Sequence, residues 1–202
     1  ISFQMGFVGQ QIAVGYHMYR YGLDHHDSET KGKGKSMVDF WISDAIMKTY
    51  FPTVWWDPAD NATAGQRREY PSFLRCFVDG MEGLLDAYRI SVAHNEPQEA
   101  WNQALKRVAS NLVKKQNEDG SFYRAYKTNG DVETGGDRNT HGTSKLNTPV
   151  AIRFLVKMFE HTGETKYKEA AIKAADFSYN ELYLKLGKYV GGTPDNPNTV
   201  DK

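Results

Sequence analysis

The sequence has little of several features that assign proteins to a functional class. Cys76 is the only cysteine, which excludes an intrachain disulfide and a cysteine-based zinc site. Lys and Arg together number 25, and Asp and Glu together also number 25, so the formal net charge is zero. Proteins that bind nucleic acid through its phosphates usually carry a basic excess. We therefore expect no nucleic-acid partner.

Long hydrophobic runs and nucleotide-binding motifs are also missing. No apolar stretch approaches the roughly 18 residues that cross a bilayer, so we expect no membrane partner. Lys31, Lys33 and Lys35 lack P-loop spacing, and we interpret them as a solvated basic turn. His25 and His26 are adjacent and have no further ligand one helical turn on. We therefore expect neither a metal site nor a cofactor.

The most informative feature that is present is an internal repeat. Three segments share one plan, in which a short polar turn joins two amphipathic helices. The turns lie at 25–31, 94–101 and 161–167, with centres about 67 residues apart. Strand signals are nearly absent. The pattern predicts an all-α protein of three consecutive helical hairpins.

The spacing of apolar residues supports a helix in each segment. Positions i, i+3, i+4 and i+7 are apolar in 71–92 and again in 98–114, which places one apolar stripe on each helix. A third helix is predicted from 149, with Thr148 as its N-cap and Pro149 in its first turn. Residues 166–183 are predicted to form its partner.

The connections between the pairs are long and fall at 51–70, 117–147 and 184–202. The short turns must therefore lie at one end of the helical stack and the long loops at the other. Long loops in a compact domain are usually functional. The long-loop end is where we expect a functional site.

Three stretches carry a resemblance to a known family. Residues 149–177, PVAIRFLVKMFEHTGETKYKEAAIKAADF, resemble the helix–TG(D/E)–helix unit of six-hairpin glycosidase-like proteins. Residues 116–126, QNEDGSFYRAY, look like the Gln-x-x-Asp-Gly-Ser-aromatic segments of α/α toroids. Residues 189–202 are similar to inter-hairpin segments of bacterial glycosidase-like chains.

The resemblance implies a partial α/α toroid, with three of six hairpins present. The chain begins at Ile1 without a leader and ends at Lys202 in a loop-like stretch, so we interpret 1–202 as a single helical domain cut from a longer bacterial carbohydrate-active protein. The implied partners are an oligo- or polysaccharide and the remaining hairpins of that chain. A secretory signal lost with the N-terminus would place the protein in the periplasm or outside the cell.

Glycoside hydrolysis needs two carboxyl groups across the scissile bond, and sugars stack on aromatic rings. The long loops concentrate such residues. Predicted substrate contacts are Trp55, Trp56, Arg68, Tyr123, Arg124, Tyr126, Arg138 and His141. Simpler interpretations remain open, because one of the two tryptophans can cover the core and Asp119-Gly120-Ser121 is typical of a β-turn.

Three carboxyl groups are candidates for proton transfer. Asp137 precedes a predicted helix N-terminus, and Asp79 or Glu69 is its predicted partner. Asp79 follows Arg75 by one helical turn, so the two can also form a simple surface ion pair. Gly80 and Gly83 leave two positions of the same helix without side chains, which indicates close approach by a neighbouring element or a ligand.

The leading functional hypothesis is a glycoside hydrolase that uses an acid/base carboxyl pair. A polysaccharide lyase, with Tyr or His as base and Arg facing a uronate, also fits the second long loop. A sugar epimerase and a non-catalytic glycan-binding or scaffold module remain as alternatives. Terpene cyclisation is disfavoured because no Asp-Asp-x-x-Asp run occurs.

Overall fold

The structure is a computed structural model. It describes residues 3–4, 10–43, 47, 49–52, 55–57, 62–63, 71–134 and 142–186. The described chain is mostly helical with almost no strand, which confirms the all-α prediction. Among the helices described, none combines the length and apolar character needed to cross a membrane.

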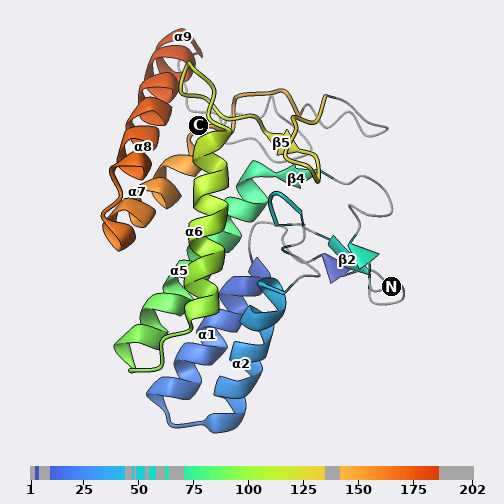
Figure 1. Ribbon diagram of the computed structural model, residues 1–202, viewed down its shortest axis with the longest axis vertical. Coiled ribbons are helices and arrows are strands. Elements are labelled where there is room, and N and C mark those ends of the chain that lie inside the picture. The colour runs from blue at the N-terminus through green and yellow to red at the C-terminus, as the bar shows by residue number, and fades with distance from the viewer. Residues whose placement is uncertain are drawn as a thin grey trace.

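The helices form three consecutive pairs (Figure 1). The first pair is α1 (Gln10–Asp24) and α2 (Ser28–Trp41). The second is α5 (Leu74–Ala93) and α6 (Glu99–Lys114). The third is α7 (Val150–Thr162) and α8 (Thr165–Phe177), and α8 continues through the π-helical segment η2 (Ser178–Tyr183) into α9 (Leu184–Leu186).

Local chemistry explains where the short turns fall. Asp27 caps α2, because its Oδ1 accepts hydrogen bonds from the backbone N–H groups of Glu29 and Thr30 at 3.1 and 3.0 Å. Gly163 ends α7 in the left-handed conformation, with φ of 73°. Thr148 is not the N-cap of α7, contrary to the sequence prediction. Its hydroxyl instead accepts a hydrogen bond from Phe122 N at 3.0 Å.

Helix α5 is the centre of the molecule. It contacts α1 on one side and α7 on the other, while α2, α6 and α8 each pack against their own partners (Figure 1). All six residues of Gly80–Leu85 are buried, so α5 is enclosed around its whole circumference there. The described helices therefore form a row of α1, α5 and α7, with one further helix packed on each.

Glycines bring the helices into backbone contact. A Cβ on Gly80 would lie 2.8 Å from the Trp41 ring, and one on Gly83 would lie 3.0 Å from Ile12. A Cβ on Gly34 would lie only 2.2 Å from the backbone N of Tyr19. The predicted close approach at Gly80 and Gly83 is thus made by neighbouring helices. The stretch 31–35 belongs to α2, so the prediction of a basic turn there is wrong.

Among the described residues, four ion pairs join α5 to α7, and three of them link residues 71 positions apart. Arg153 contacts Glu82, Lys157 contacts Asp86 at 3.8 Å, and Glu160 contacts Arg89 at 3.8 Å. The constant separation of these three pairs means that successive turns of α5 face successive turns of α7. Three pairs with one separation show that α5 and α7 lie side by side in a single register.

Short strands connect the long loops to the helices. β4 (Ser72–Phe73) pairs antiparallel with β5 (Ala125–Tyr126), directly before α5 begins. β2 (Trp55–Asp57) lies between β1 (Phe3–Gln4) and β3 (Ala62–Thr63) in an antiparallel sheet. Figure 1 shows these strands on the side of the molecule away from the short turns.

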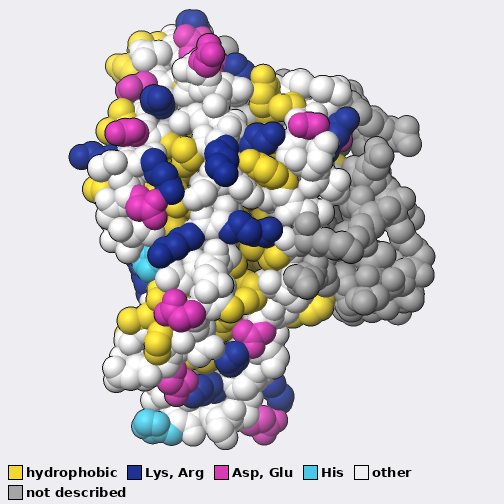
Figure 2. All heavy atoms as spheres, viewed as in Figure 1, with side chains coloured by type: hydrophobic (Ala, Val, Ile, Leu, Met, Phe, Trp, Pro, Cys, Tyr) yellow, Lys and Arg dark blue, Asp and Glu magenta, His cyan; other side chains and the backbone are white. Residues whose placement is uncertain are grey.

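The outer surface carries a basic region over α6. Figure 2 shows Lys and Arg side chains gathered on this face of the molecule. Within α6, Glu99 in the first turn is the single acidic residue, whereas Lys106, Arg107 and Lys114 follow. The chain has no net charge, but its basic residues are unevenly distributed and are concentrated over α6.

Candidate functional site

Parts of two long connections, 51–70 and 117–147, meet at the N-terminal end of α5. The backbone N of Leu74 donates to the carbonyl of Arg124, and the backbone N of Arg124 donates to the carbonyl of Ser144, both at 2.8 Å. The hydroxyl of Ser72 donates to the carbonyl of Pro52 at 3.1 Å. These bonds fix parts of both long loops beside the first turn of α5, at the end where the sequence predicts a site.

The segment 116–122 is a structural turn. Asp119 Oδ1 accepts from Ser121 N at 3.0 Å, and Gly120 has φ of +85° with no room for a side chain against Lys173 O. Gln116 Nε2 donates to the carbonyl of Ala170 at 2.8 Å, which connects the turn to α8. The Gln-x-x-Asp-Gly-Ser motif therefore positions a loop rather than a ligand.

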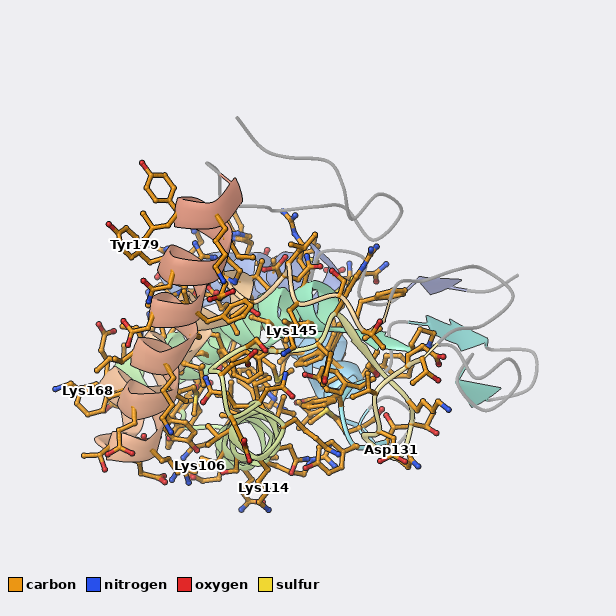
Figure 3. The ribbon with its side chains drawn as sticks, turned by 90° about the horizontal axis from the view of Figure 1, so that it is seen from above. Lys106, Lys114, Asp131, Lys145, Lys168 and Tyr179 are labelled. Atoms are coloured by element: carbon orange, nitrogen blue, oxygen red, sulfur yellow. The ribbon has the colours of Figure 1, made fainter. Side chains whose placement is uncertain are left out.

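Lys145 links this turn to the end of the same long connection. Its Nζ lies 2.6 Å from Asp119 Oδ2 and 5.7 Å from the centre of the Tyr123 ring. Burial opposes ionisation of Asp119, but the hydrogen bonds from Lys145 and Ser121 together outweigh it and lower the pKa of this carboxyl. Figure 3 shows Lys145 near the middle of the view from above, whereas Tyr179 of η2 and Lys168 of α8 lie at its edge.

The structure places two predicted contact residues near this end of α5. Tyr123 is half-buried beside Lys145. Arg124 is 2% exposed, and its guanidinium lies 5.9 Å from the centre of the Phe73 ring. Arg124 also lines a shallow crevice with Phe73, Arg75 and Asn147. Tyr123 is therefore accessible to a ligand, whereas Arg124 is almost completely buried and the crevice beside it has no room for a water molecule, so the predicted contact of Arg124 stays a prediction.

Tyr126 belongs to the core. Its side chain has no exposed surface, and its ring packs 4.9 Å from that of Phe51 and 6.5 Å from that of Phe77. Burial raises the pKa of its phenol above the ordinary value, and its oxygen accepts a hydrogen bond from Tyr123 N at 3.1 Å. A side chain placed in this way supports the loop and does not contact a ligand.

Asp79 lies in the second turn of α5, beside the fixed loops. Its carboxyl is 30% exposed, and Asp79 Oδ2 is 3.9 Å from Arg75 Nε. Burial raises the pKa of Asp79 from 3.8 to about 6, and the negative charge of Glu82 acts in the same direction. The positive charges of Arg75 and Arg153 act in the opposite direction. The result is a carboxyl that exchanges its proton near neutral pH.

Glu82 lies three residues further along the same face and has a different environment. Its side chain is 6% exposed. Oε2 lies 2.7 Å from Arg153 Nη2 and 3.1 Å from Lys157 Nζ, and Oε1 accepts from Arg153 Nε at 3.0 Å. Two cations therefore face this one carboxylate. Glu82 orients Arg153 and is not a proton-transfer group.

Arg153 and Lys157 are absent from the predicted site, because both lie within a helix and not in a long loop. A signal for them exists in the sequence. Arg153 and Lys157 are spaced i, i+4 on one helix, and Glu82 and Asp86 have the same spacing on an earlier one. Opposite charges with matching i, i+4 spacing on two predicted helices indicate that those helices are paired there.

The remaining predicted site residues cannot be placed beside Asp79. Glu69, Arg68, Asp137, Arg138 and His141 lie outside the described residues. Trp55 and Trp56 are described only as backbone of β2, opposite Gln4 and Phe3 of β1. The predicted roles of these seven residues stay predictions.

A pocket of about 270 Å³ lies elsewhere, against α1 and α2. Its lining residues are Gln11, Ser36, Met37, Phe40 and Trp41. None of these has a carboxyl group, so this pocket offers no proton-transfer chemistry. Within the part of the chain that the structure describes, no three His, Cys, Asp or Glu side chains are grouped to hold a metal ion.

No protein-family model matches this sequence, and no curated protein matches it either. Function is therefore inferred from the geometry around Asp79.

Proposed function

We propose that this chain is part of an α/α toroid that hydrolyses glycosidic bonds, with Asp79 as a proton-transfer carboxyl. One observation carries the proposal. Asp79 is half-buried at the long-loop end of the central helix, and its pKa is raised to about 6. A general acid works best when its pKa lies near the operating pH, and glycosidases obtain such an acid by burying a carboxyl group.

The arrangement of the helices supports the toroid. Three helical pairs stand side by side, with α1, α5 and α7 as successive inner helices. Three of the four described ion pairs between α5 and α7 share one separation, so further hairpins could add to the row in the same register. The polar face of α5 that holds Asp79 would then line the central cleft.

Hydrolysis requires a second carboxyl group opposite Asp79. Glu82 does not fill this role, because Arg153 and Lys157 hold it. We propose Asp137 or Glu69 from the long loops. Tyr123 and Arg124 would contact the sugar, together with the predicted contacts Trp55, Trp56, Arg68, Arg138 and His141.

The test is an assay of the purified protein against a panel of oligo- and polysaccharides. New reducing ends and ultraviolet absorbance are both recorded, for the wild type, Asp79→Asn and the control Asp176→Asn on the exposed side of α8. We expect reducing ends without ultraviolet absorbance, a loss of about 100-fold or more in Asp79→Asn, and no loss in the control.

The other outcomes identify the alternatives. Reducing ends that appear together with an absorbing unsaturated sugar would establish a lyase. Glycan binding without turnover, unchanged in Asp79→Asn, would overturn the enzyme proposal and leave a glycan-binding module.

A further inference from the structure

The arginine beside Asp79 is held in an unusual way. Arg153 lies in the first turn of α7, and its Nε and Nη2 contact the two oxygens of Glu82 at 3.0 and 2.7 Å. This contact uses one edge of the planar guanidinium. Glu82 is almost completely buried, whereas the Arg153 side chain is 73% exposed. A buried carboxylate thus fixes a guanidinium whose other edge faces outward.

The second edge of Arg153 is chemically available. The guanidinium carries five N–H donors in a rigid fork, and the Nη1/Nη2 edge can bind a second carboxylate through two parallel hydrogen bonds. Within the described residues, Glu82 is the one side chain that Arg153 hydrogen-bonds. Because Glu82 already fixes the side chain, a ligand would bind to it with a small loss of conformational entropy.

The local charge favours an anion. Three carboxyl groups, of Asp79, Glu82 and Asp86, stand with three cations, of Arg75, Arg153 and Lys157. When Asp79 holds a proton, as a general acid must before it acts, one positive charge is left over. An ion pair that only joined α5 to α7 would not need this extra positive charge, since Lys157 already contacts Glu82 and its side chain is only 25% exposed.

We propose that Arg153 is a specificity-determining residue that binds the carboxylate of an acidic sugar, so that the substrate is a uronate-containing glycan. The inference rests on the proposed function for its choice of a sugar. The planar fork of the guanidinium suits a carboxylate, and the adjacent Asp79 would then face a bond of the same sugar unit.

Binding of the anion also affects Asp79. The positive charge of Arg153 lowers the pKa of Asp79, in opposition to burial and Glu82, while Arg75 acts in the same direction as Arg153. A substrate carboxylate on Arg153 neutralises part of that charge. The pKa of Asp79 therefore rises when an acidic sugar binds, which keeps the proton on the general acid in the complex.

The experiment compares two probes that differ in charge, trigalacturonate and its methyl ester. Binding to the purified protein is measured by calorimetry at low salt for the wild type, Arg153→Gln, Arg153→Lys and the control Lys168→Gln. Lys168 is exposed on α8 at the edge of the molecule (Figure 3), where its Nζ lies 5.7 Å from the centre of the Phe159 ring and makes no ion pair among the described residues. Thermal unfolding of each variant verifies that it is folded.

We expect the wild type and Lys168→Gln to prefer the acid over the ester by about 10-fold. Arg153→Gln should bind the two probes within about twofold of each other, and Arg153→Lys should be intermediate because it keeps the charge without the fork. Equal binding of both probes to the wild type, absence of acid binding, or an unchanged preference in Arg153→Gln would overturn the inference. A protein that binds the acid through Arg153 but cleaves no glycan would sink the hydrolase proposal alone.

Discussion

At the scale of single residues, the Asp79 carboxyl gains its chemistry from burial. Arg75 lies 3.9 Å away, too far for a strong hydrogen bond, so the cation compensates only part of the lost hydration. Glu82, one helical turn away, keeps two cations at close range. Two carboxyl groups on one helix face therefore have different roles because their partners differ.

The raised pKa of Asp79 predicts a pH-dependent effect on stability. Because the pKa is about 6 when folded and 3.8 ordinarily, the folded protein binds this proton more tightly than the unfolded chain. The contribution of Asp79 to stability is complete below about pH 4 and is lost as the pH rises through about 6. Asp79→Asn should therefore unfold with about 1–2 kcal/mol more free energy than the wild type above about pH 7, after allowance for solvent screening.

This gain should vanish at about pH 4, where the wild-type carboxyl is protonated. Denaturant unfolding at both pH values measures the difference, with Asp176→Asn as the exposed control. Equal stability of Asp79→Asn and the wild type at neutral pH would mean that the carboxyl is well solvated.

The sequence predicts part of this chemistry. The helical spacing of Arg75, Asp79 and Glu82 is sufficient by itself to place the three residues on one face. The pKa shift of Asp79 is not predictable in this way, because burial and the charge of Arg153 come from segments distant in the sequence.

At the scale of elements, α1 and α2 pack with backbone contact at a glycine. A Cβ on Gly34 would lie 2.2 Å from the backbone N of Tyr19, whereas a Cβ on Gly32 would meet nothing within 4 Å. We predict that Gly34→Ala lowers the free energy of unfolding by about 2 kcal/mol or more, since the clash exceeds the gain in helix propensity. Gly32→Ala on the same helix should raise it by about 0.5–1 kcal/mol.

Denaturant unfolding of the two glycine variants measures both changes. The comparison is well matched because the substitutions are identical and lie two residues apart on α2. Similar effects of both would contradict the close packing of α1 against α2.

The ion pairs between α5 and α7 differ in burial, and so should their contributions. Glu82 is 6% exposed and faces two cations, whereas Glu160 is 59% exposed and lies 3.8 Å from Arg89. We predict that Glu82→Gln lowers the free energy of unfolding by about 1–3 kcal/mol, because Arg153 and Lys157 lose their shared counter-charge. Glu160→Gln should change it by less than about 0.5 kcal/mol. Thermal and denaturant unfolding of the two variants would refute this ranking if Glu160→Gln were the more damaging.

Helices are the elements that the sequence predicts best. Their apolar stripes give the segments 71–92 and 98–114, close to the observed α5 and α6. The cap of α7 is predicted wrongly, because the hydroxyl of Thr148 binds Phe122 from a distant loop. The lysine-rich stretch 31–35 is helical and packs against α1 at Gly34, a contact that local composition does not reveal.

At the scale of the whole molecule, three helical pairs depend on one central helix. Helix α5 contacts both α1 and α7, while α9 extends beyond the stack (Figure 1). Native-state hydrogen exchange should therefore be slowest in α5 around Met81–Leu85, where amides open only with global unfolding. Exchange in α9 should be faster by several orders of magnitude, through local opening. Equal protection of the two helices would contradict the central position of α5.

The position of the site within the molecule follows from connection length. Short turns and long loops alternate along the sequence, which places the loops together at one end, and the pairing of β4 with β5 is found there. Which loop residues meet is not predictable, because that depends on single hydrogen bonds such as Leu74 N to Arg124 O. Tyr126 illustrates the difficulty, since an aromatic residue in a long loop fills the core here.

The central claim is that the pKa of the Asp79 carboxyl is raised to about 6, and a carbon-13 NMR titration of this carboxyl tests it directly. Asp79→Asn assigns the signal. We predict a midpoint at about 6, shifted upward in Arg75→Gln because that arginine lowers the pKa of Asp79. A midpoint at or below about 4 would show an ordinary solvated carboxylate and would contradict the role of Asp79 as a general acid.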